Sequence, residues 1–230
     1  MTAIVPDSVW LTVLLMLAAC CLEVRAEEAA PAPAKVAATG LSPDGEARRH
    51  HLTPGDSLGD LLNHPAFAGY VERVLPWDDR AYDGAMALRE IGSLLPYHSN
   101  VDPGAVVAAL NRMIDDVAAE RPVFHDIYSA AERRVQPDKA HAGLFFFRGR
   151  PDAPFAGIAP GGGFAYVGSV HEGFPYALDI SRQGLNAFVL KYRAGHGGRV
   201  ATEDLAAALS YIFRNAETLE RFRITHDRTL

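Results

Sequence analysis

A run of three glycines directly after an apolar segment constrains this chain more than any other feature. The segment Phe155–Ala159 is predicted to be a β-strand, because it is short, apolar and bounded by Pro154 and Pro160. The loop that follows it at once is Pro160-Gly161-Gly162-Gly163-Phe164. Consecutive glycines cost backbone entropy and add no side-chain packing. We therefore expect this loop to need unusual dihedral angles, or a close approach of its backbone to a ligand.

Glycine-rich loops after strands serve several chemistries, and the spacing of the glycines separates them. A dinucleotide-binding loop needs spaced glycines, and a phosphate-binding P-loop ends in Gly-Lys-Ser/Thr, which is absent here. Backbone amides of a glycine loop can also form an oxyanion hole, which stabilises the negative charge that develops in acyl transfer. An oxyanion hole and a purely structural turn both remain as interpretations of Gly161–Gly163.

The second half of the chain alternates short apolar segments with helical patterns, which predicts an α/β fold with a mostly parallel sheet covered by helices. A helix is expected to end near Gln183, and Asn186–Tyr192 is the next buried strand, expected to lack a further parallel neighbour. Thr202 is the predicted N-cap of a final helix that ends near Leu219. The stripe that this helix is expected to bury contains Leu205, Leu209, Ile212 and Phe213.

The first half has a helical pattern. Two short helices, interrupted at Pro65, are predicted within His51–Trp77. Asp102 and Pro103 form a helix start, and that helix should end near Glu120. Further strands are predicted at Val123–Tyr128 and Leu144–Phe147. The expected organisation is a signal peptide at 1–26, a flexible linker at 27–50, a small helical segment at 51–121 and an α/β domain at 122–230.

Four segments resemble the amino-terminal half of α/β-hydrolase esterases and lipases, of the carboxylesterase-like type related to the hormone-sensitive-lipase group. They are Ala159–Phe164, Ser169–Pro175, Gly184–Arg193 and Ala201–Leu205. The resemblance implies half of an α/β-hydrolase sheet, hydrolysis of a small-molecule ester by a serine nucleophile, no cofactor, and an oxyanion hole formed by the amides of Gly162 and Gly163. Many members have histidine where this chain has Pro160, which leaves the subfamily and the substrate open.

The rest of the catalytic machinery is not found in the sequence. The family's serine lies on a Gly-x-Ser-x-Gly elbow, followed later by an acid and a histidine. The elbow is expected just after Leu219, where the segment Arg221–Leu230 has no such motif. We therefore expect no catalytic residue here and no activity of the chain alone. A noncatalytic exported lipoprotein or binding module, and a truncated or frame-shifted gene product, are the alternatives.

Several polar residues have a simpler explanation than catalysis. The segment Gly55–Gly59 matches the elbow by letter, but it lies on a turn that leads into a helix, so Ser57 is predicted to start that helix. Ser169 and Glu172 have the spacing of a capping box. His171 is expected to be a hydrogen-bonded polar residue at a helix start. His196, which precedes two glycines, is expected in a flexible connection.

The amino terminus is predicted to be an export signal, because Val9–Leu22 is apolar but shorter than a typical membrane-spanning helix. Cleavage after Ala26 would release the protein, whereas a lipobox ending at Cys20 would tether it to a membrane by a lipid. Both cysteines, Cys20 and Cys21, lie here, so no disulfide or cysteine metal site is expected in the folded part. The net charge of −6 and the lack of Lys/Arg clusters argue against nucleic-acid binding.

Overall fold

The computed structural model describes residues 50–96, 100–216 and 219. All of them belong to the second of two compact units, residues 40–230. The predicted signal segment, both predicted cleavage sites and the predicted linker up to residue 49 lie outside the described residues, as do residues 220–230. The helices are α2 (Leu58–Leu62), α3 (Val71–Val74), α4 (Pro103–Ala118), α5 (Ala130–Val135), α6 (Phe174–Arg182) and α7 (Gly197–Arg214). The 3₁₀-helical segments are η1 (Pro65–Phe67), η2 (Leu88–Leu94) and η3 (Pro137–His141), and η4 (Ser169–Gly173) is π-helical.

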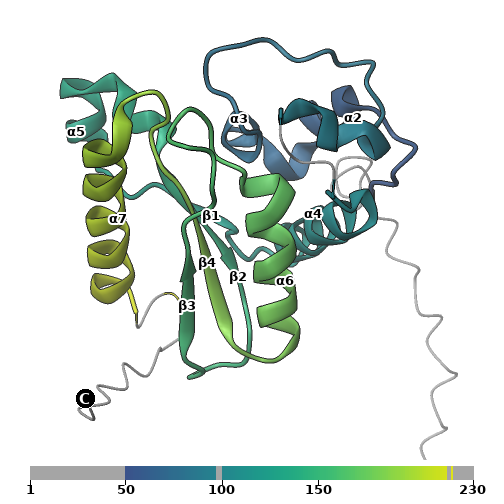
Figure 1. The fold of residues 1–230 in the computed structure, drawn as a ribbon. Coiled ribbons are helices and arrows are strands. Elements are labelled where there is room, and N and C mark those ends of the chain that lie inside the picture. Colours follow the sequence, from purple (N-terminus) through teal and green to yellow (C-terminus); the bar gives the residue numbers. More distant parts are fainter. Residues whose placement is uncertain (1–49, 97–99, 217–218, 220–230) are drawn as a thin grey trace, which may run out of the picture. The chain divides into compact units, whose positions relative to one another are not determined.

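Four strands form one mixed sheet, so the fold is α/β (Figure 1). They are β1 (Phe124–His125), β2 (Gly143–Phe147), β3 (Phe155–Ile158) and β4 (Asn186–Lys191), in the order β1-β2-β4-β3. β2 runs antiparallel to both β1 and β4, and only β3 and β4 are parallel. The expectation of a mostly parallel sheet is therefore wrong. A short turn reverses the chain after β2, whereas α6 carries it back between β3 and β4, as a parallel connection requires.

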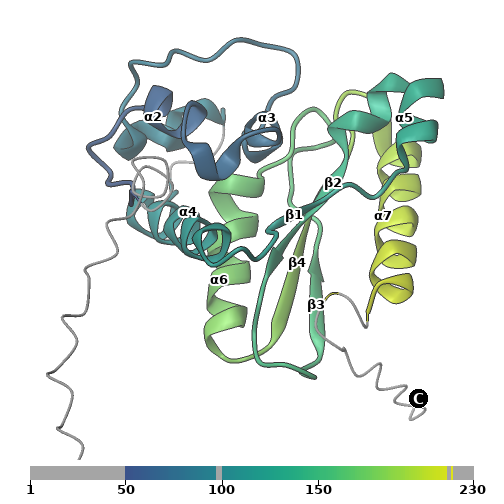
Figure 2. The ribbon, with the colours of Figure 1, turned by 180° about the vertical axis from the view of Figure 1, so that it is seen from behind.

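The sheet is buried on both faces, which explains why its central strands are apolar without alternation. Phe145 and Phe147 of β2 pack in a core with α4 and α6, and the intervening Phe146 packs on the opposite face with α7. The two faces alternate because successive side chains of a strand point in opposite directions. Figures 1 and 2 show α6 and α7 on opposite sides of the sheet.

The amino-terminal elements agree with the sequence pattern. Pro65 separates α2 from α3 and begins η1. Ser57 is the N-cap of α2: its hydroxyl accepts a hydrogen bond from the Asp60 amide at 3.1 Å, and the Asp60 carboxylate accepts one from the Ser57 amide at 2.8 Å. This capping box confirms Ser57 as a helix-start residue. Asp102 caps α4 by accepting a hydrogen bond from the Gly104 amide at 2.8 Å, also as predicted.

The final helix differs from its prediction. α7 begins at Gly197, so the sequence His196-Gly197-Gly198 is a helix start and not a flexible connection. Thr202 is not a cap but lies inside the helix, where its hydroxyl donates to the Gly198 carbonyl at 2.8 Å. The residues of α7 that are buried are Val200, Ala201, Asp204, Ala208 and Ile212.

The exposed side chains of α7 correct the predicted stripe as well. Of the four residues in that stripe only Ile212 is buried, and Leu205, Leu209 and Phe213 are 40%, 37% and 47% exposed. Small residues such as Ala201 and Ala208 face the sheet instead. Within the described part of the chain the sheet has two edges, β1 and β3, because each is paired on one side only, whereas β4 is paired on both sides. Over the described ranges, no helix is long and apolar enough to cross a membrane.

Candidate functional site

The glycine loop leaves the carboxyl end of β3 with a backbone that few residues adopt. Gly162, Gly163 and Phe164 have φ angles of 146°, 57° and 63°. A Cβ atom on Gly162 would lie 1.9 Å from the Tyr166 carbonyl oxygen, whereas one on Gly163 would meet nothing within 4 Å. Both glycines are therefore needed, Gly162 for space and Gly163 for its left-handed conformation. The unusual dihedral angles expected from the sequence are confirmed.

The amides of the loop fall into two groups. The Gly161 amide donates to Oε1 of Glu172, a residue of η4. For the amides of Gly162, Gly163 and Phe164 no acceptor exists among the residues that the structure describes. Polar backbone groups are nearly always paired when they are buried. The second group therefore consists of donors that remain available to solvent or a ligand.

Carbonyl groups hold the same loop in place. The Gly161 carbonyl accepts a hydrogen bond from the Gly168 amide at 3.0 Å, and the Gly162 carbonyl accepts one from the Ala165 amide at 3.0 Å. The Phe164 carbonyl accepts one from the Gly195 amide at 2.7 Å, which ties the end of the loop to the segment before α7. Hydrogen bonds at both ends thus fix the direction of the unpaired amides.

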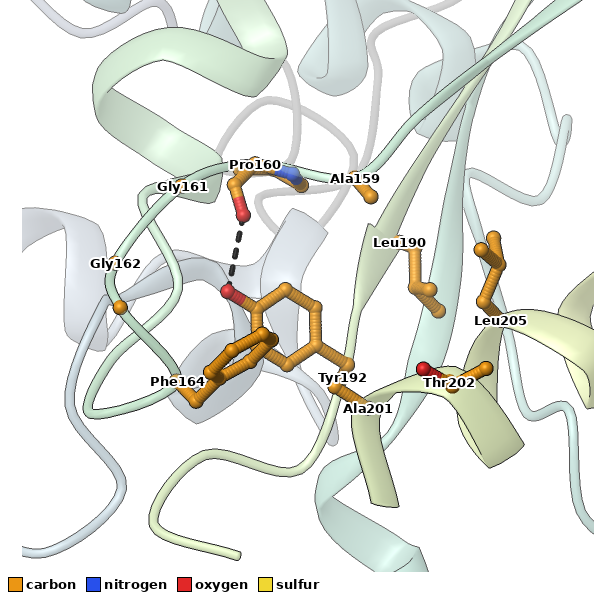
Figure 3. A pocket seen from close by; sticks show the side chains of 11 residues that line it. Ala159, Pro160, Gly161, Gly162, Phe164, Leu190, Tyr192, Ala201, Thr202 and Leu205 are labelled. Carbon is orange, nitrogen blue, oxygen red and sulfur yellow. Dashed lines mark hydrogen bonds between the residues drawn. The ribbon is translucent and has the colours of Figure 1, made fainter. Parts of the chain in front are cut away.

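The loop forms one wall of a pocket with a volume of about 260 Å³ (Figure 3). The other walls come from the end of β4 and the first turns of α7. No acidic or basic side chain is among the described residues that line it. The lining residues are Ala159, Pro160, Gly161, Gly162, Gly163, Phe164, Leu190, Tyr192, Ala201, Thr202 and Leu205.

Two side-chain hydroxyls line the pocket, and neither is equipped as a nucleophile. The Tyr192 hydroxyl lies 3.0 Å from the Pro160 carbonyl oxygen (Figure 3). It also lies 3.4 Å from the Tyr166 carbonyl oxygen. Burial raises the pKa of Tyr192 to about 12, so the phenol stays protonated and donates to the loop. The Thr202 hydroxyl donates within its own helix. Since no described side chain that lines the pocket is a base, neither hydroxyl has the partner that a nucleophile needs.

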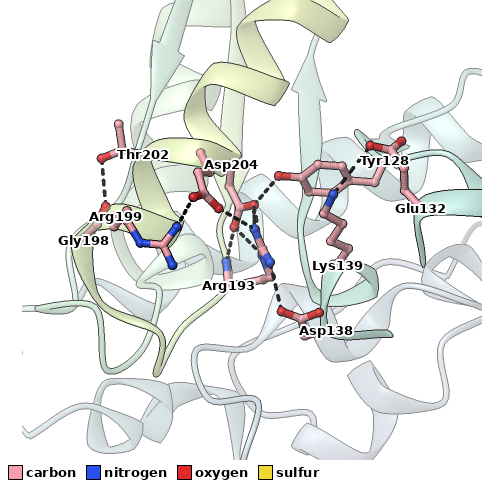
Figure 4. Close-up of polar contacts among 10 residues, drawn as sticks. Tyr128, Glu132, Asp138, Lys139, Arg193, Gly198, Arg199, Thr202 and Asp204 are labelled. Carbon is pink, nitrogen blue, oxygen red and sulfur yellow. Dashed lines mark hydrogen bonds and ion pairs between the residues drawn. The ribbon is translucent and has the colours of Figure 1, made fainter. Parts of the chain in front are cut away.

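A buried ion pair joins the end of β4 to α7, and both of these elements contribute walls to the pocket (Figure 4). Arg193 follows β4, and its Nη2 atom lies 2.8 Å from Oδ1 of Asp204 in α7, a fully buried carboxylate. The Asp204 carboxylate also accepts from the Arg193 amide at 2.8 Å and from the Tyr128 hydroxyl at 2.6 Å. Asp138 binds Nη1 of Arg193 at 2.9 Å. The network fixes α7 against the end of β4, and with it two walls of the pocket.

The other polar residues considered in the sequence lie away from the pocket lining. Ser57 is at the start of α2. Ser169 is not a cap, because its fully buried hydroxyl has no hydrogen-bond partner in the described part of the chain and Glu172 binds the loop instead. His171 is buried, and its Nε2 atom lies 2.8 Å from the Ile91 carbonyl oxygen, which confirms it as a hydrogen-bonded polar residue.

Family models, curated proteins and solved structures gave no match to the chain. Over the described residues, no group of three or more His, Cys, Asp or Glu side chains is placed to hold a metal ion. The site is a pocket whose described lining residues carry no charged side chain, and it is bordered by backbone amides that have no acceptor among the described residues.

Two features of the site were missed in the sequence. The spacing of Glu172 from Ser169 matches a capping box, and this local pattern concealed the contact of Glu172 with Gly161. The ion pair of Arg193 and Asp204 joins a strand end to a helix, and no local pattern relates two such residues. The nearest signal in the sequence was that Arg193 and Asp204 carry opposite charges and that each lies next to a predicted apolar segment.

Proposed function

We propose that this chain is the amino-terminal part of an α/β-hydrolase esterase and contributes the oxyanion hole for serine-dependent hydrolysis of a carboxylic ester. The donors are the amides of Gly162 and Gly163. One observation carries the proposal: these amides have no acceptor among the described residues, and they border a pocket without charged side chains at the carboxyl end of a strand. Phe164 has a third amide of this kind.

During ester hydrolysis, negative charge develops on the carbonyl oxygen of the substrate. Attack on an ester carbonyl turns its oxygen into an oxyanion, and donors already fixed in place stabilise that charge without reorganising. Loss of one such donor typically costs roughly 10²–10³ in rate. The left-handed backbone of Gly163 and the hydrogen bonds at both ends of the loop supply this rigidity.

The arrangement of the sheet also supports the proposal. The glycine loop follows β3, and the resemblance implies an oxyanion-hole loop after the third strand. The nucleophile elbow is a strand, a sharp turn and a helix. The open edge of β3 and the exposed Leu205, Leu209 and Phe213 of α7 are surfaces on which such a unit can pair and pack.

The alternative is a noncatalytic exported binding module. It is favoured by the absence of any nucleophile paired with a base among the described residues that line the pocket. Under either proposal the chain alone does not turn over an ester, since amides stabilise an oxyanion only after a nucleophile has attacked. The two proposals differ in what happens when a serine, an acid and a histidine are supplied.

The first test uses the chain itself and a tetrahedral anion. n-Butylphosphonate imitates the charge of the tetrahedral intermediate and carries a short apolar chain. When it is titrated into ¹⁵N-labelled protein, we expect saturable shifts of the Gly162 and Gly163 amide signals. Inorganic sulfate at matched ionic strength is the control for nonspecific anion effects. Shifts that are confined to other residues would refute the oxyanion hole.

The second test supplies the missing residues. The carboxyl-terminal half of an α/β-hydrolase esterase, with its elbow, acid and histidine, is fused after Leu219 and assayed on p-nitrophenyl butyrate beside the chain alone. We expect turnover only by the fusion, and a fall of roughly 10²–10³ in kcat when Gly162→Ala displaces the amide. The control is Gly69→Ala. Gly69 also has a positive φ, but a Cβ atom there would meet nothing within 4 Å.

Three results of this test decide between the proposals. A folded fusion that binds butylphosphonate but does not turn over supports the binding module. Turnover that Gly162→Ala leaves unchanged rejects the oxyanion hole. Turnover by the chain alone shows that a nucleophile lies within these 230 residues.

A further inference from the structure

The carboxylate of Glu172 lies in a space that two glycines leave open. A Cβ atom on Gly161 would lie 3.1 Å from Oε1 of Glu172, and one on Gly168 would lie 3.3 Å from the same atom. The two glycines are joined by the hydrogen bond from the Gly168 amide to the Gly161 carbonyl at 3.0 Å. The Gly161 amide then donates to Oε1. The carboxylate therefore connects the first amide of the glycine loop to the segment that begins η4.

The π-helical turn explains how Glu172 reaches this place. In η4 the Gly173 amide bonds the Gly168 carbonyl and the Phe174 amide bonds the Ser169 carbonyl, each five residues back. Pro175 follows in the first turn of α6 and has no amide to donate. The wider turn directs Glu172 to the glycine loop, although the spacing predicted that it would cap a helix at Ser169. π-Helical turns of this kind often occur at functional sites.

Charge distinguishes Glu172 from the other groups that hold the loop. Among the described residues, the other hydrogen bonds to the loop come from backbone groups and from the neutral hydroxyl of Tyr192, whereas Glu172 supplies a carboxylate acceptor. Hydrogen bonds to an ionised acceptor are shorter and roughly twice as strong as neutral ones. The contact also occupies the Gly161 amide, so that the donors left for a ligand begin at Gly162.

We propose that Glu172 is a positioning residue for the oxyanion hole: its carboxylate fixes Gly161 and thereby directs the amides of Gly162 and Gly163 toward the pocket. This role rests on the proposed function. It also accounts for Pro160, which stands where many α/β-hydrolases have a loop-anchoring histidine. Here the anchor comes from η4, the π-helical turn that leads into α6.

The experiment measures the loop directly in the ¹⁵N-labelled full chain by amide hydrogen exchange and chemical shift. In Glu172→Ala we expect the Gly161 amide proton to move upfield and to exchange roughly ten- to a hundredfold faster, the range that loss of a hydrogen bond to a charged group implies. Glu172→Gln keeps an acceptor oxygen and should retain most of the protection. Asp179→Ala, which removes an exposed carboxylate from α6, is the matched control.

The same variants report on the neighbouring donors. In Glu172→Ala the Gly162 and Gly163 signals should broaden and lose their response to butylphosphonate, with Glu172→Gln restoring it. An unchanged Gly161 signal and exchange rate in Glu172→Ala would overturn the proposal. If Glu172→Ala does not fold, Glu172→Gln is read alone: its neutral oxygen is a weaker acceptor than a carboxylate, so the Gly161 amide proton should move part of the way upfield. A Gly161 proton that does not move upfield in Glu172→Gln would then overturn the proposal.

The outcomes keep this role separate from the proposed function. If butylphosphonate shifts no loop amide in the wild type, the oxyanion hole is rejected. The exchange rate of the Gly161 amide still shows whether Glu172 holds the loop, because that measurement needs neither ligand nor turnover.

Discussion

Replacing Asp204 by alanine should destabilise the protein more than any surface substitution on the same helix. The Asp204 carboxylate is fully buried, and it is an acceptor for the Tyr128 hydroxyl, the Arg193 amide and the Arg193 guanidinium. Removing one partner of a buried ion pair usually costs about 3–5 kcal/mol, because the other charge stays buried without compensation. Arg193 keeps Asp138 at 2.9 Å, whose side chain is 38% exposed, so we expect the lower end, about 3 kcal/mol.

The assay is urea unfolding followed by far-ultraviolet circular dichroism, with the free energy of unfolding obtained by linear extrapolation. Glu203→Ala is the control, since Glu203 is the neighbouring residue on α7 and is 49% exposed. Its main partner is the exposed Arg199, and its contact with Nη2 of Arg193 is long, at 3.8 Å. It should change stability by less than about 0.5 kcal/mol. The double variant Asp204→Ala with Arg193→Met should recover part of the loss, because it removes the uncompensated charge. A cost below about 1 kcal/mol for Asp204→Ala would refute this account of the network.

Three further predictions concern pH, capping and processing. Burial lowers the pKa of His125 from 6.5 to about 4, so the folded state favours the neutral ring. The contribution of His125 to the free energy of unfolding is therefore complete above pH 6.5 and is lost as the pH falls toward 4. This loss amounts to at most about 3 kcal/mol. Urea unfolding across this range should show a shallower acid decline in His125→Gln. Ser57→Ala should lose about 1 kcal/mol of stability by urea unfolding, and a fluorophosphonate probe should leave Ser57 unlabelled. Mass spectrometry of exported protein should find a mature amino terminus at lipidated Cys20 or just after Ala26.

Each of these has an opposing result. An acid decline equally steep in His125→Gln would place the titrating group elsewhere in the protein. Probe labelling that Ser57→Ala abolishes would make Ser57 a nucleophile despite its capping box. An intact Met1 on protein recovered outside the cytoplasm would exclude both processing sites.

Local signals in the sequence predicted the elements that depend on neighbouring residues. Ser57 and Asp102 begin helices because a short polar side chain can bond an amide two or three positions ahead, and Gly184 ends α6 because it adopts φ of 86°. The glycine loop was found in the same way, since its composition reflects its own backbone. These signals need no knowledge of the tertiary structure.

The features that were predicted wrongly depend on distant parts of the chain. Which face of α7 is buried was decided by close packing of Ala201 and Ala208 on the sheet, while the hydrophobic pattern favoured Leu205 and Leu209. The direction of β2 depends on its partners β1 and β4, which a single strand's composition does not encode. The place of Glu172 depends on a π-helical turn, whereas the spacing of Ser169 and Glu172 in the sequence matches a capping box.

The open edge of β3 should be a weak site of association between molecules at high protein concentration. An edge strand offers its amides and carbonyls to any other extended chain, which is how sheets join into aggregates. β3 is a poor template for this process, because it is only four residues long, is bounded by Pro154 and Pro160, and contains Gly157. Few intermolecular backbone bonds can form along it, so colloidal behaviour should be governed by the apolar side chains of α7 and should improve when Phe213 is made polar.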